Sequence, residues 1–257
     1  MIFVIGGNGY VGSAYPRLFS DLGLEHQVIT RENYESFAGR GCDVLINANG
    51  NSKKFMADRD PKWEFDASVR TVLHSLEDFP SDCYILLSTG DVYPEQHSPE
   101  VSREDAAIDS KRQSRYGLHK HTAEHLVRSI HPRSIVMRMG GFVGPGMKKN
   151  AVFDMLNGQP VWLTPDSELQ FISTDTAARL VWALYENGVG DEVVNLGAQG
   201  VVRIGDLHER LGSASPFSPE ARRVRFEIST EMLARLTGAP LPTTADEVEA
   251  FFRSIGR

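Results

Sequence analysis

The chain has 257 residues, of which 41% are hydrophobic and 24% charged, and its formal net charge at pH 7 is −7. This composition is typical of a globular protein, and the length suffices for one large core or for two coupled domains. The negative charge argues against coating nucleic acid, and no apolar run approaches the roughly 20 residues of a membrane span, so we expect neither kind of partner.

The first 140 residues alternate short apolar runs with amphipathic stretches. The apolar runs predict buried parallel strands at Ile2–Ile5, Gln27–Thr30, Asp43–Ala48, Cys83–Ser88 and Ser134–Arg138. The amphipathic stretches predict helices at Tyr10–Gly23, about 61–79 and Arg115–Ile130. About a dozen residues separate the second strand from the third, so the usual intervening helix is curtailed there. Repeated strand–helix–strand units predict an α/β fold with a doubly wound parallel sheet.

Beyond residue 140, glycines and prolines interrupt the chain more often. A short helix is predicted at Ala151–Leu156 and a longer one at Thr174–Glu186, followed by a strand at Val193–Leu196 that we expect to return to the main sheet. Two more short helices are predicted in the tail after Ser213. We therefore expect a first domain over residues 1–142, with a return segment at about 171–199, and a smaller lobe over 143–170 and 200–257.

A glycine-rich loop joins the first strand to the first helix. Gly6 permits a tight turn, Gly9 lets the backbone approach a pyrophosphate, and Gly12 lets helix and strand pack closely. The helix N-terminus adds free N–H groups and a partial positive charge. This context predicts a dinucleotide site with contacts from Gly6, Asn8, Gly9, Tyr10, Val11 and Gly12.

The end of the second strand selects between the two nicotinamide dinucleotides. An acidic side chain there bonds the ribose 2′-hydroxyl of NAD, whereas an arginine accommodates the 2′-phosphate of NADP. The chain has Arg31 at this point, directly followed by Glu32. Arg31 favours NADP over NAD, although a solvated loop arginine has the same pattern.

Tyr116 and Lys120 lie four residues apart on a predicted helix, so they share one face. An ammonium beside a phenol stabilises the tyrosinate, so Tyr116 could exchange a proton with a substrate hydroxyl or carbonyl near neutral pH. Ser88 and Thr89 end the strand just upstream, at the carboxyl edge of the sheet where ligands bind. A hydroxyl there can polarise the oxygen that Tyr116 protonates.

Six separate segments over residues 1 to about 200 together resemble the extended short-chain dehydrogenases/reductases, also called the NAD-dependent epimerase/dehydratase family. They are Gly6–Gly12, Asp43–Ala48, Ser88–Tyr93, Tyr116–Lys120, Arg138–Gly146 and Phe171–Asp175. The resemblance implies a Rossmann dinucleotide-binding domain and a C-terminal substrate-binding lobe. It also implies the family's catalytic Ser/Thr, Tyr and Lys roles for Thr89, Tyr116 and Lys120, with Lys120 also bonding the nicotinamide ribose.

The resemblance extends the expected site beyond these three residues. Further cofactor contacts are expected from Asn47, Ala48 and Ser88, beside Arg31, Tyr116 and Lys120. Expected substrate contacts are Thr89, Asp91, Tyr116, Gly141 and Asn150. No metal is expected, because the implied reaction class needs none.

Departures from the family pattern narrow the implied chemistry. Sugar-nucleotide 4,6-dehydratases of the family follow the catalytic Thr with Asp-Glu, whereas this chain has Gly90-Asp91 and lacks the acid that expels the leaving hydroxyl. Asp91 stands where related epimerase-reductases place an extra acid/base, and it is equally typical of a turn. Gly141 replaces the family's usual asparagine, and Gln170 stands where an arginine commonly grips the substrate diphosphate.

These observations lead to one preferred function and three alternatives. We expect an NAD(P)-dependent oxidoreductase that acts on a nucleotide-activated sugar, as a 4-keto-sugar reductase with a Thr/Tyr/Lys triad. The nearest alternative is an NAD-dependent epimerase or dehydratase that retains its cofactor. The others are a reductase of free ketones or aldehydes and a non-catalytic NADP-sensing regulator.

Association and location are also expected from the resemblance and the composition. Related enzymes often dimerise through helices that correspond here to about 61–79 and 115–130, so a homodimer is expected. Cys42 and Cys83 each sit at an apolar run, which is typical of buried reduced thiols in a cytoplasmic protein.

Overall fold

The computed structural model describes residues 1–51 and 53–257. The chain divides into two compact units. The first comprises Met1–Pro94, Ala107–Met139 and Ala178–Asn195, and the second comprises Glu95–Ala106, Gly140–Ala177 and Leu196–Arg257.

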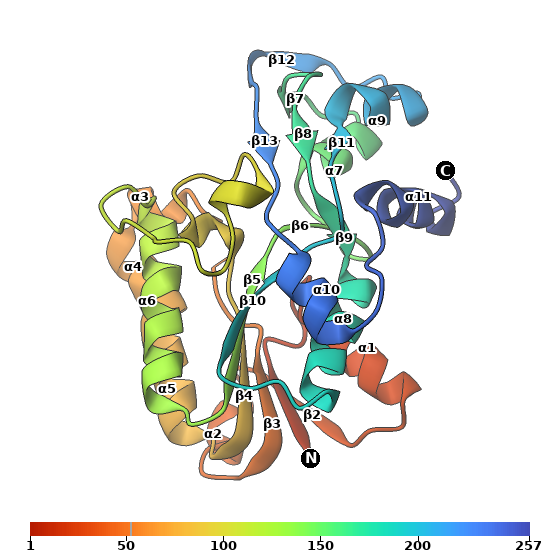
Figure 1. The fold of residues 1–257 in the computed structure, drawn as a ribbon. Coiled ribbons are helices and arrows are strands. Elements are labelled where there is room, and N and C mark those ends of the chain that lie inside the picture. Colours follow the sequence, from red (N-terminus) through yellow and green to blue (C-terminus); the bar gives the residue numbers. More distant parts are fainter. Residues whose placement is uncertain (52) are drawn as a thin grey trace. The chain divides into compact units, whose positions relative to one another are not determined.

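A six-stranded sheet forms the centre of the first unit (Figure 1). Its strands are β1 (Ile2–Ile5), β2 (His26–Ile29), β3 (Cys42–Asn47), β4 (Ser81–Leu87), β5 (Ser134–Met139) and β10 (Glu192–Leu196). They lie in the order β10-β5-β4-β3-β1-β2, and the pairings among β1 to β5 are parallel. The predicted doubly wound sheet and the return of β10 to it are confirmed. The chain leaves β1 toward opposite sides to form β2 and β3, so the ligand-binding crevice of such a sheet is expected between β1 and β3.

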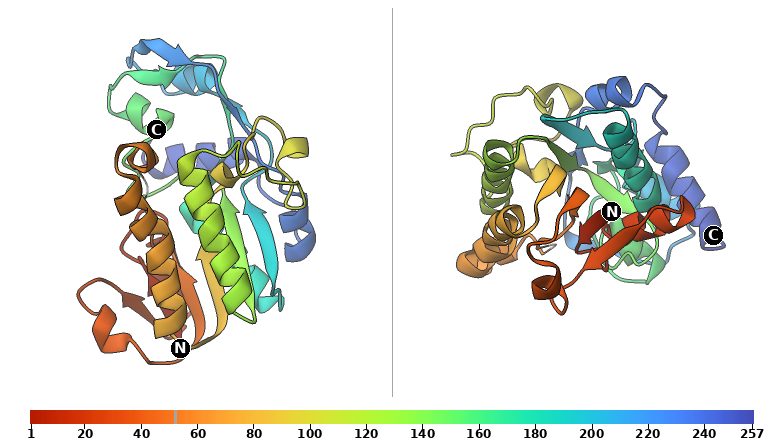
Figure 2. Two further views of the ribbon diagram at one scale, coloured as in Figure 1. Left: turned by 90° about the vertical axis from the view of Figure 1, so that its left-hand side faces the viewer. Right: turned by 90° about the horizontal axis from the view of Figure 1, so that it is seen from below.

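Helices cover both faces of this sheet (Figures 1 and 2). On one face are α5 (Thr71–Asp78) and α6 (Arg115–Ile130), whose Val72, Ala123 and Val127 join the core of the strands. On the other are α1 (Ala14–Asp21) and the C-terminal part of α8 (Thr174–Glu186), where the ring centroids of Phe19 and Trp182 are 4.9 Å apart. Because both faces are covered, the strands contain runs of consecutive buried apolar residues, such as Ile2–Ile5 in β1 and Val44–Ile46 in β3, as the sequence predicted.

Two predicted helices differ from those observed. The stretch at 61–79 is α4 (Pro61–Phe65), a π-helical turn at Asp66–Arg70 and then α5, with the short α3 (Met56–Arg59) before it. The helix predicted from Tyr10 begins as α1 at Ala14, because residues 10–13 are needed to turn the glycine-rich loop. The predicted curtailed connection after β2 is confirmed and holds only α2 (Tyr34–Phe37).

The second unit consists of short elements. Its helices are the predicted α7 (Ala151–Leu156), the unpredicted α9 (Ile204–Arg210), and the two tail helices α10 (Glu231–Thr237) and α11 (Thr244–Ser254). Its strand pairs are β6 (Gly141–Val143) with β9 (Phe171–Ser173), β7 (Val161–Leu163) with β12 (Phe217–Arg222), and β8 (Glu168–Leu169) with both β11 (Val202–Arg203) and β13 (Arg225–Phe226). The sequence did not reveal these strands, because most have only two or three residues and carry no readable periodicity, and the six-residue β12 contains a proline and mainly polar residues.

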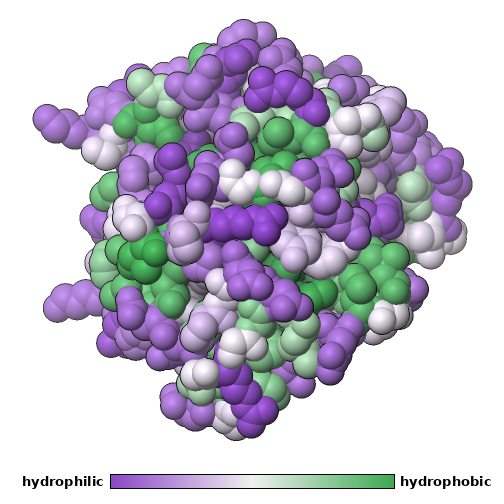
Figure 3. Space-filling model, turned by 60° about the horizontal axis from the view of Figure 1, so that its bottom comes forward, coloured by the Kyte–Doolittle hydropathy of each residue, from purple (hydrophilic) through white to green (hydrophobic). Residues whose placement is uncertain are grey.

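Hydrophobic and polar residues are interspersed on the surface. On the face shown in Figure 3, hydrophobic residues form separate patches with polar residues between them. Among the helices of the described residues, none has the length and apolar character needed to cross a bilayer.

Candidate active site

The glycine-rich loop makes a tight turn at the end of β1. Gly6 has a φ of +76°, which favours glycine, and its carbonyl oxygen accepts a hydrogen bond from the Gly9 amide at 2.9 Å. A Cβ added at Gly12 would lie 2.3 Å from that same oxygen. The loop therefore presents a bare backbone just ahead of α1, as the sequence predicted.

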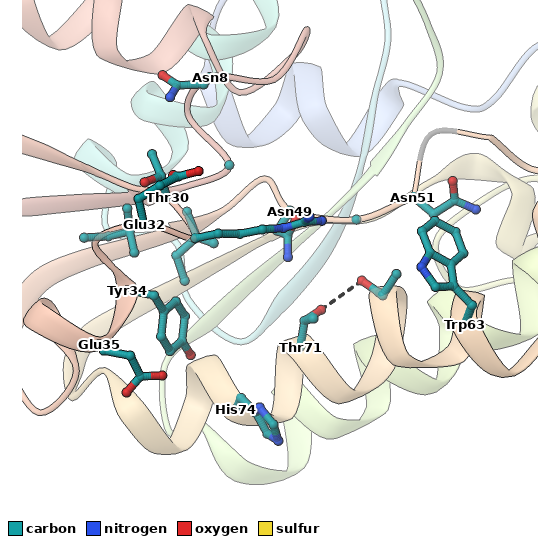
Figure 4. Close-up of a pocket in the computed structure, with 16 residues that line it drawn as sticks. Asn8, Thr30, Glu32, Tyr34, Glu35, Asn49, Asn51, Trp63, Thr71 and His74 are labelled. Carbon is teal, nitrogen blue, oxygen red and sulfur yellow. Dashed lines mark hydrogen bonds between the residues drawn. The ribbon is translucent and has the colours of Figure 1, made fainter.

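A cavity of about 620 Å³ lies at the carboxyl ends of β1 and β2 and beside the segment that follows β3 (Figure 4). Its lining residues are Ile5, Gly6, Asn8, Ile29, Thr30, Arg31, Glu32, Tyr34, Glu35, Asn49, Gly50, Asn51, Trp63, Ala67, Thr71 and His74. In Figure 4, Glu32 and Glu35 lie toward one end and Asn51 and Trp63 at the other, with Asn49 between them. The cavity thus occupies the crevice expected from the strand order.

One end of the cavity contains both signs of charge. The exposed side chains of Arg31, Glu32 and Glu35 all belong to its lining. A hydrogen bond from Thr30 lowers the pKa of the Glu32 carboxyl, with further contributions from its own backbone N–H and from the charge of Arg31. An arginine and two carboxyl side chains therefore meet at the end of β2, where the sequence pointed to Arg31 and to the Glu32 that follows it, and the structure adds Glu35.

The polar residues at the end of β3 and just after it face two directions, one toward the protein interior and one toward the cavity. Asn47 is buried, and its Nδ2 donates to Tyr84 Oη at 2.7 Å and to Ser75 Oγ at 3.0 Å. Its Oδ1 accepts from the Asn49 amide at 3.0 Å. Asn47 thus shapes the segment, and the cavity is lined by Asn49, Gly50 and Asn51 and not by Asn47 or Ala48. The sequence analysis did not select Asn49, Gly50 or Asn51, although the run of polar residues directly after an apolar strand is a signal that could have found them.

Tyr116 and Lys120 both reach this segment from α6. Ser114 caps the N-terminus of this helix, because its Oγ accepts a hydrogen bond from the Gly117 amide at 3.0 Å. Tyr116 Oη donates to the Asn51 carbonyl oxygen at 3.2 Å. Lys120 is buried, and its Nζ lies 3.7 Å from where a Cβ on Gly50 would stand. The ends of both side chains therefore adjoin the cavity-lining segment.

The pKa of each group is shifted by its surroundings. Burial raises the pKa of the Tyr116 phenol, and the charges of Asp91 and Glu64 raise it further. Burial lowers the pKa of Lys120 to about 8, partly opposed by Glu124 and Glu64. The direction at Tyr116 is opposite to that expected from a neighbouring ammonium alone, because desolvation dominates and Lys120 Nζ donates to the Leu87 carbonyl oxygen at 3.1 Å.

Thr89 and Asp91 form a small hydrogen-bonded turn at the end of β4. Thr89 Oγ1 accepts the Asp91 amide at 3.2 Å and donates to Asp91 Oδ2 at 2.8 Å. Lys54 Nζ lies 2.7 Å from Oδ1 and 2.5 Å from Oδ2 of Asp91. Lys54 was not selected from the sequence, because only the fold brings it to a residue 37 positions away.

The other expected residues have different surroundings. Ser88 Oγ donates to the buried carboxylate of Glu124 and does not line the cavity. Gly141 and Asn150 belong to the second unit. There a Cβ on Gly141 would lie 2.6 Å from the Gln170 carbonyl oxygen, and Asn150 caps α7 by accepting the Phe153 amide at 2.9 Å.

The sequence profile described as the NAD dependent epimerase/dehydratase family matches residues 2–197. The chain belongs to this family. A nicotinamide dinucleotide is the cofactor that the family implies, and the residues present fit it: the loop at Gly6–Gly12 admits no side chain at its closest approach, and the cavity beside it has polar side chains along its length.

Several solved structures resemble this chain over nearly its full length. They include a dTDP-4-dehydrorhamnose reductase from Clostridium acetobutylicum, with a TM-score of 0.81 at 16% identity over 100% of this chain and 99% of that one. RMD from Pseudomonas aeruginosa, complexed with NADPH, has a TM-score of 0.80 at 19% identity over 98% and 99%. A UDP-glucuronic acid 4-epimerase from Bacillus cereus has a TM-score of 0.79 at 18% identity over 99% and 98%. At such identities the likeness establishes the fold. None of the curated proteins matches the sequence.

Proposed function

We propose that this family member is an NAD(P)-dependent oxidoreductase of nucleotide-activated sugars and that it reduces a 4-keto sugar with Thr89, Tyr116 and Lys120. The observation that carries the proposal is the approach of Tyr116 and Lys120 to the 49–51 segment, which lines the cavity next to the glycine-rich loop. Similar folds occur in structures described as a UDP-glucuronic acid 4-epimerase and a dTDP-4-dehydrorhamnose reductase, which supports a nucleotide sugar as substrate.

The proposed cofactor contacts follow from the cavity. The backbone of the loop at Gly6–Gly12 and the start of α1 would hold the pyrophosphate. Asn8 and Arg31, which line the cavity, and the segment after Ala48 would hold the remainder. When bound, the nicotinamide supplies the hydride that reduces the sugar carbon.

In the proposed reaction, the chain's own groups handle the substrate oxygen. Tyr116 donates its phenolic proton to the carbonyl oxygen as the carbon is reduced. Thr89 turns its hydroxyl from Asp91 to that same oxygen, while Lys54 keeps the charge of Asp91 compensated. The buried ammonium of Lys120 stabilises the tyrosinate that remains.

Reduction needs a proton at the substrate oxygen. The phenol of Tyr116 carries a proton at neutral pH, as tyrosine ordinarily does, and burial raises its pKa further. The acid that a dehydratase places after the catalytic Thr is replaced by Gly90 in this chain. Reduction of a ketone needs a hydride and a single proton, and Tyr116 carries that proton, so no second acid is required.

A Tyr116→Phe variant tests the mechanism. Loss of the proton donor should lower kcat by about 10²- to 10⁴-fold, whereas the dissociation constant of the dinucleotide should change little. The measurement is steady-state reduction of 4-keto sugars linked to UDP, GDP, CDP or dTDP, together with a fluorescence titration of NADPH. Full turnover by the variant sinks this mechanism, and wild-type protein that binds NADPH but reduces no substrate points to a cofactor-sensing regulator.

The choice of cofactor separates the reductase from its nearest alternative. Arg31 at the cavity favours NADPH, so Arg31→Ala should weaken NADPH binding about tenfold and NADH binding much less. Glu32 and Glu35, which line the same end, favour the alternative, an epimerase that binds NAD through its ribose hydroxyls. Denaturing the purified protein and identifying any released nucleotide decides between them, because retained NAD indicates the epimerase and an empty site with NADPH affinity indicates the reductase.

The two parts of the chain have separate proposed roles. Residues 1–142, with the return segment at about 171–199, are the proposed dinucleotide-binding domain. Residues 143–170 and 200–257 are the proposed substrate-binding lobe, and Gly141 and Asn150 are proposed substrate contacts near its start. Competition by UDP, GDP or CDP for the substrate site separates a nucleotide sugar from a free ketone or aldehyde.

A further inference from the structure

A buried ion pair lies behind the strand end that carries Thr89. Glu124 on α6 faces Arg138 on β5, with Arg138 Nη2 2.8 Å and Nε 3.1 Å from Glu124 Oε2. The two residues are only 2% and 4% exposed. Both belong to the first unit, and the proposed reaction uses neither of them directly.

Both ends of the turn from Thr89 to Val92 are attached to this pair. Ser88, directly before the turn, donates its hydroxyl to the carboxylate of Glu124. Tyr93, directly after it, accepts a hydrogen bond from Arg138 Nη1 at 3.0 Å and lies with its ring centroid 4.9 Å from the guanidinium carbon. Tyr93 Oη in turn donates to Asn195 Oδ1 at 2.9 Å.

The helix that carries Tyr116 is held against the same strand end. Lys120, one helical turn before Glu124, donates to the carbonyl oxygen of Leu87 at 3.1 Å. Gly117 approaches Asp91 so closely that an added Cβ would stand 2.1 Å from its carbonyl oxygen. The helix is therefore in contact with the strand end through Lys120 and with the turn through Gly117.

Stability alone is a poor explanation for an ion pair at this depth. The cost of removing two charges from water offsets most of their attraction, and a hydrophobic pair of similar size is often at least as stable. The pair's distinctive consequence is geometric. Movement of either side chain leaves the other charge buried without a partner, so only a narrow range of positions is tolerated.

We propose that the Glu124–Arg138 pair is a positioning device that sets the hydroxyl of Thr89 relative to that of Tyr116, so that both reach one substrate oxygen. The catalytic consequence rests on the proposed function, because the substrate oxygen belongs to that reaction. Ser88 and Tyr93 connect the pair to the turn and act as positioning residues.

Two conservative variants test the proposal. Ser88→Ala and Tyr93→Phe each remove one hydroxyl that joins the turn to the pair, while the pair itself stays intact. The control is Val127→Ala on the same helix, which opens space in the core but removes no hydrogen-bonding group from the pair or from the turn. Changing Glu124 itself is avoided, because Arg138 would be left buried without a counter-charge.

The first measurement is hydrogen exchange of the ligand-free protein. The amides of Val92 and Tyr93 bond to the carbonyl oxygens of Thr89 and Gly90 and report on the turn. Both test variants should exchange these amides faster than wild type, and Val127→Ala should not. Exchange in the test variants no faster than in Val127→Ala overturns the proposal.

The second measurement is steady-state kinetics of the same proteins. A displacement of a catalytic hydroxyl by about 1 Å is enough to slow the chemical step. We therefore expect kcat to fall roughly tenfold to a hundredfold in Ser88→Ala and Tyr93→Phe, with KM for NADPH within about twofold of wild type. Faster exchange with an unchanged kcat overturns the positioning role. Wild-type protein that reduces no activated sugar overturns the proposed function instead, and the exchange result then still decides whether the pair orders the turn.

Discussion

Lys120 brings an ammonium group to a position that is only 3% exposed. Its polar contact is the Leu87 carbonyl oxygen, and the carboxylates of Glu124 and Glu64 only partly offset the cost of desolvation. The pKa of Lys120 consequently falls to about 8, close enough to neutrality for its charge to change in the working range of an enzyme.

The dependence of stability on pH should reveal this shift. Lys120 has an ordinary pKa of 10.5 and a folded value of about 8, so between these values the unfolded chain binds more protons and the free energy of unfolding gains a contribution that rises with pH. The contribution is fully present above the unfolded value and is lost as the pH falls through about 8. Lys120→Met removes it.

Urea unfolding of wild type and Lys120→Met from pH 7.5 to 9.5 measures the effect. The wild-type free energy of unfolding, minus that of the variant, should rise by roughly 1–2 kcal/mol across this interval. The raised pKa values of the buried tyrosines occur in both proteins and cancel in the difference. A difference that stays constant contradicts the lowered pKa.

At the scale of elements, the close approach of α6 to the turn after β4 depends on a single glycine. Gly117 lies in the first turn of the helix, directly after Tyr116, where alanine would ordinarily be the better helix former. Here the added Cβ would stand 2.1 Å from the carbonyl oxygen of Asp91, which is backbone and cannot move aside alone. The glycine therefore determines the spacing between Tyr116 and the turn that carries Thr89.

Gly117→Ala should separate these two elements. We expect a loss of about 1–3 kcal/mol in stability, as for other overpacked sites, and a fall in kcat at temperatures where the variant is still folded. Thr122→Ala, a half-buried position on the same helix, is the matched control and should be close to neutral. Chemical denaturation and steady-state kinetics check both, and a stabilised, fully active Gly117→Ala protein would show that the helix can shift freely.

At the scale of the whole molecule, one helical surface of the first unit displays large apolar side chains. Trp63 and Phe65 on α4 are 45% and 41% exposed, and Leu118 on α6 is 39% exposed. Phe65 also packs edge-to-face on His119, with ring centroids 5.3 Å apart. These helices correspond to those through which a homodimer is expected.

Charged substitutions on this surface test the expected homodimer. Wild-type protein should have the mass of two chains in light scattering, and Phe65→Glu with Leu118→Glu should reduce it to one, because two buried carboxylates would repel and lack partners. Ile255→Glu in the second unit, at a residue 43% exposed, is the control and should leave the mass unchanged. A monomeric wild-type protein contradicts the expectation.

The sequence by itself determined the features that depend on local pattern. The strands of the main sheet follow from their apolar runs, the loop from glycines at 6, 9 and 12, and the shared helix face from the spacing of Tyr116 and Lys120. The six separate segments also identified the family correctly. Such features are readable because backbone conformation and periodicity act over a few residues.

The tertiary structure alone decided which polar groups meet and what their surroundings do to them. It directs Asn47 inward and Asn51 to the cavity, brings Lys54 to Asp91, and adds the carboxyl group of Glu35 to the end where the sequence already placed Arg31 and Glu32. It also reverses the expected direction of the pKa shift at Tyr116. The physical reason is that desolvation and long-range contacts depend on residues far apart in the chain, which no local pattern records.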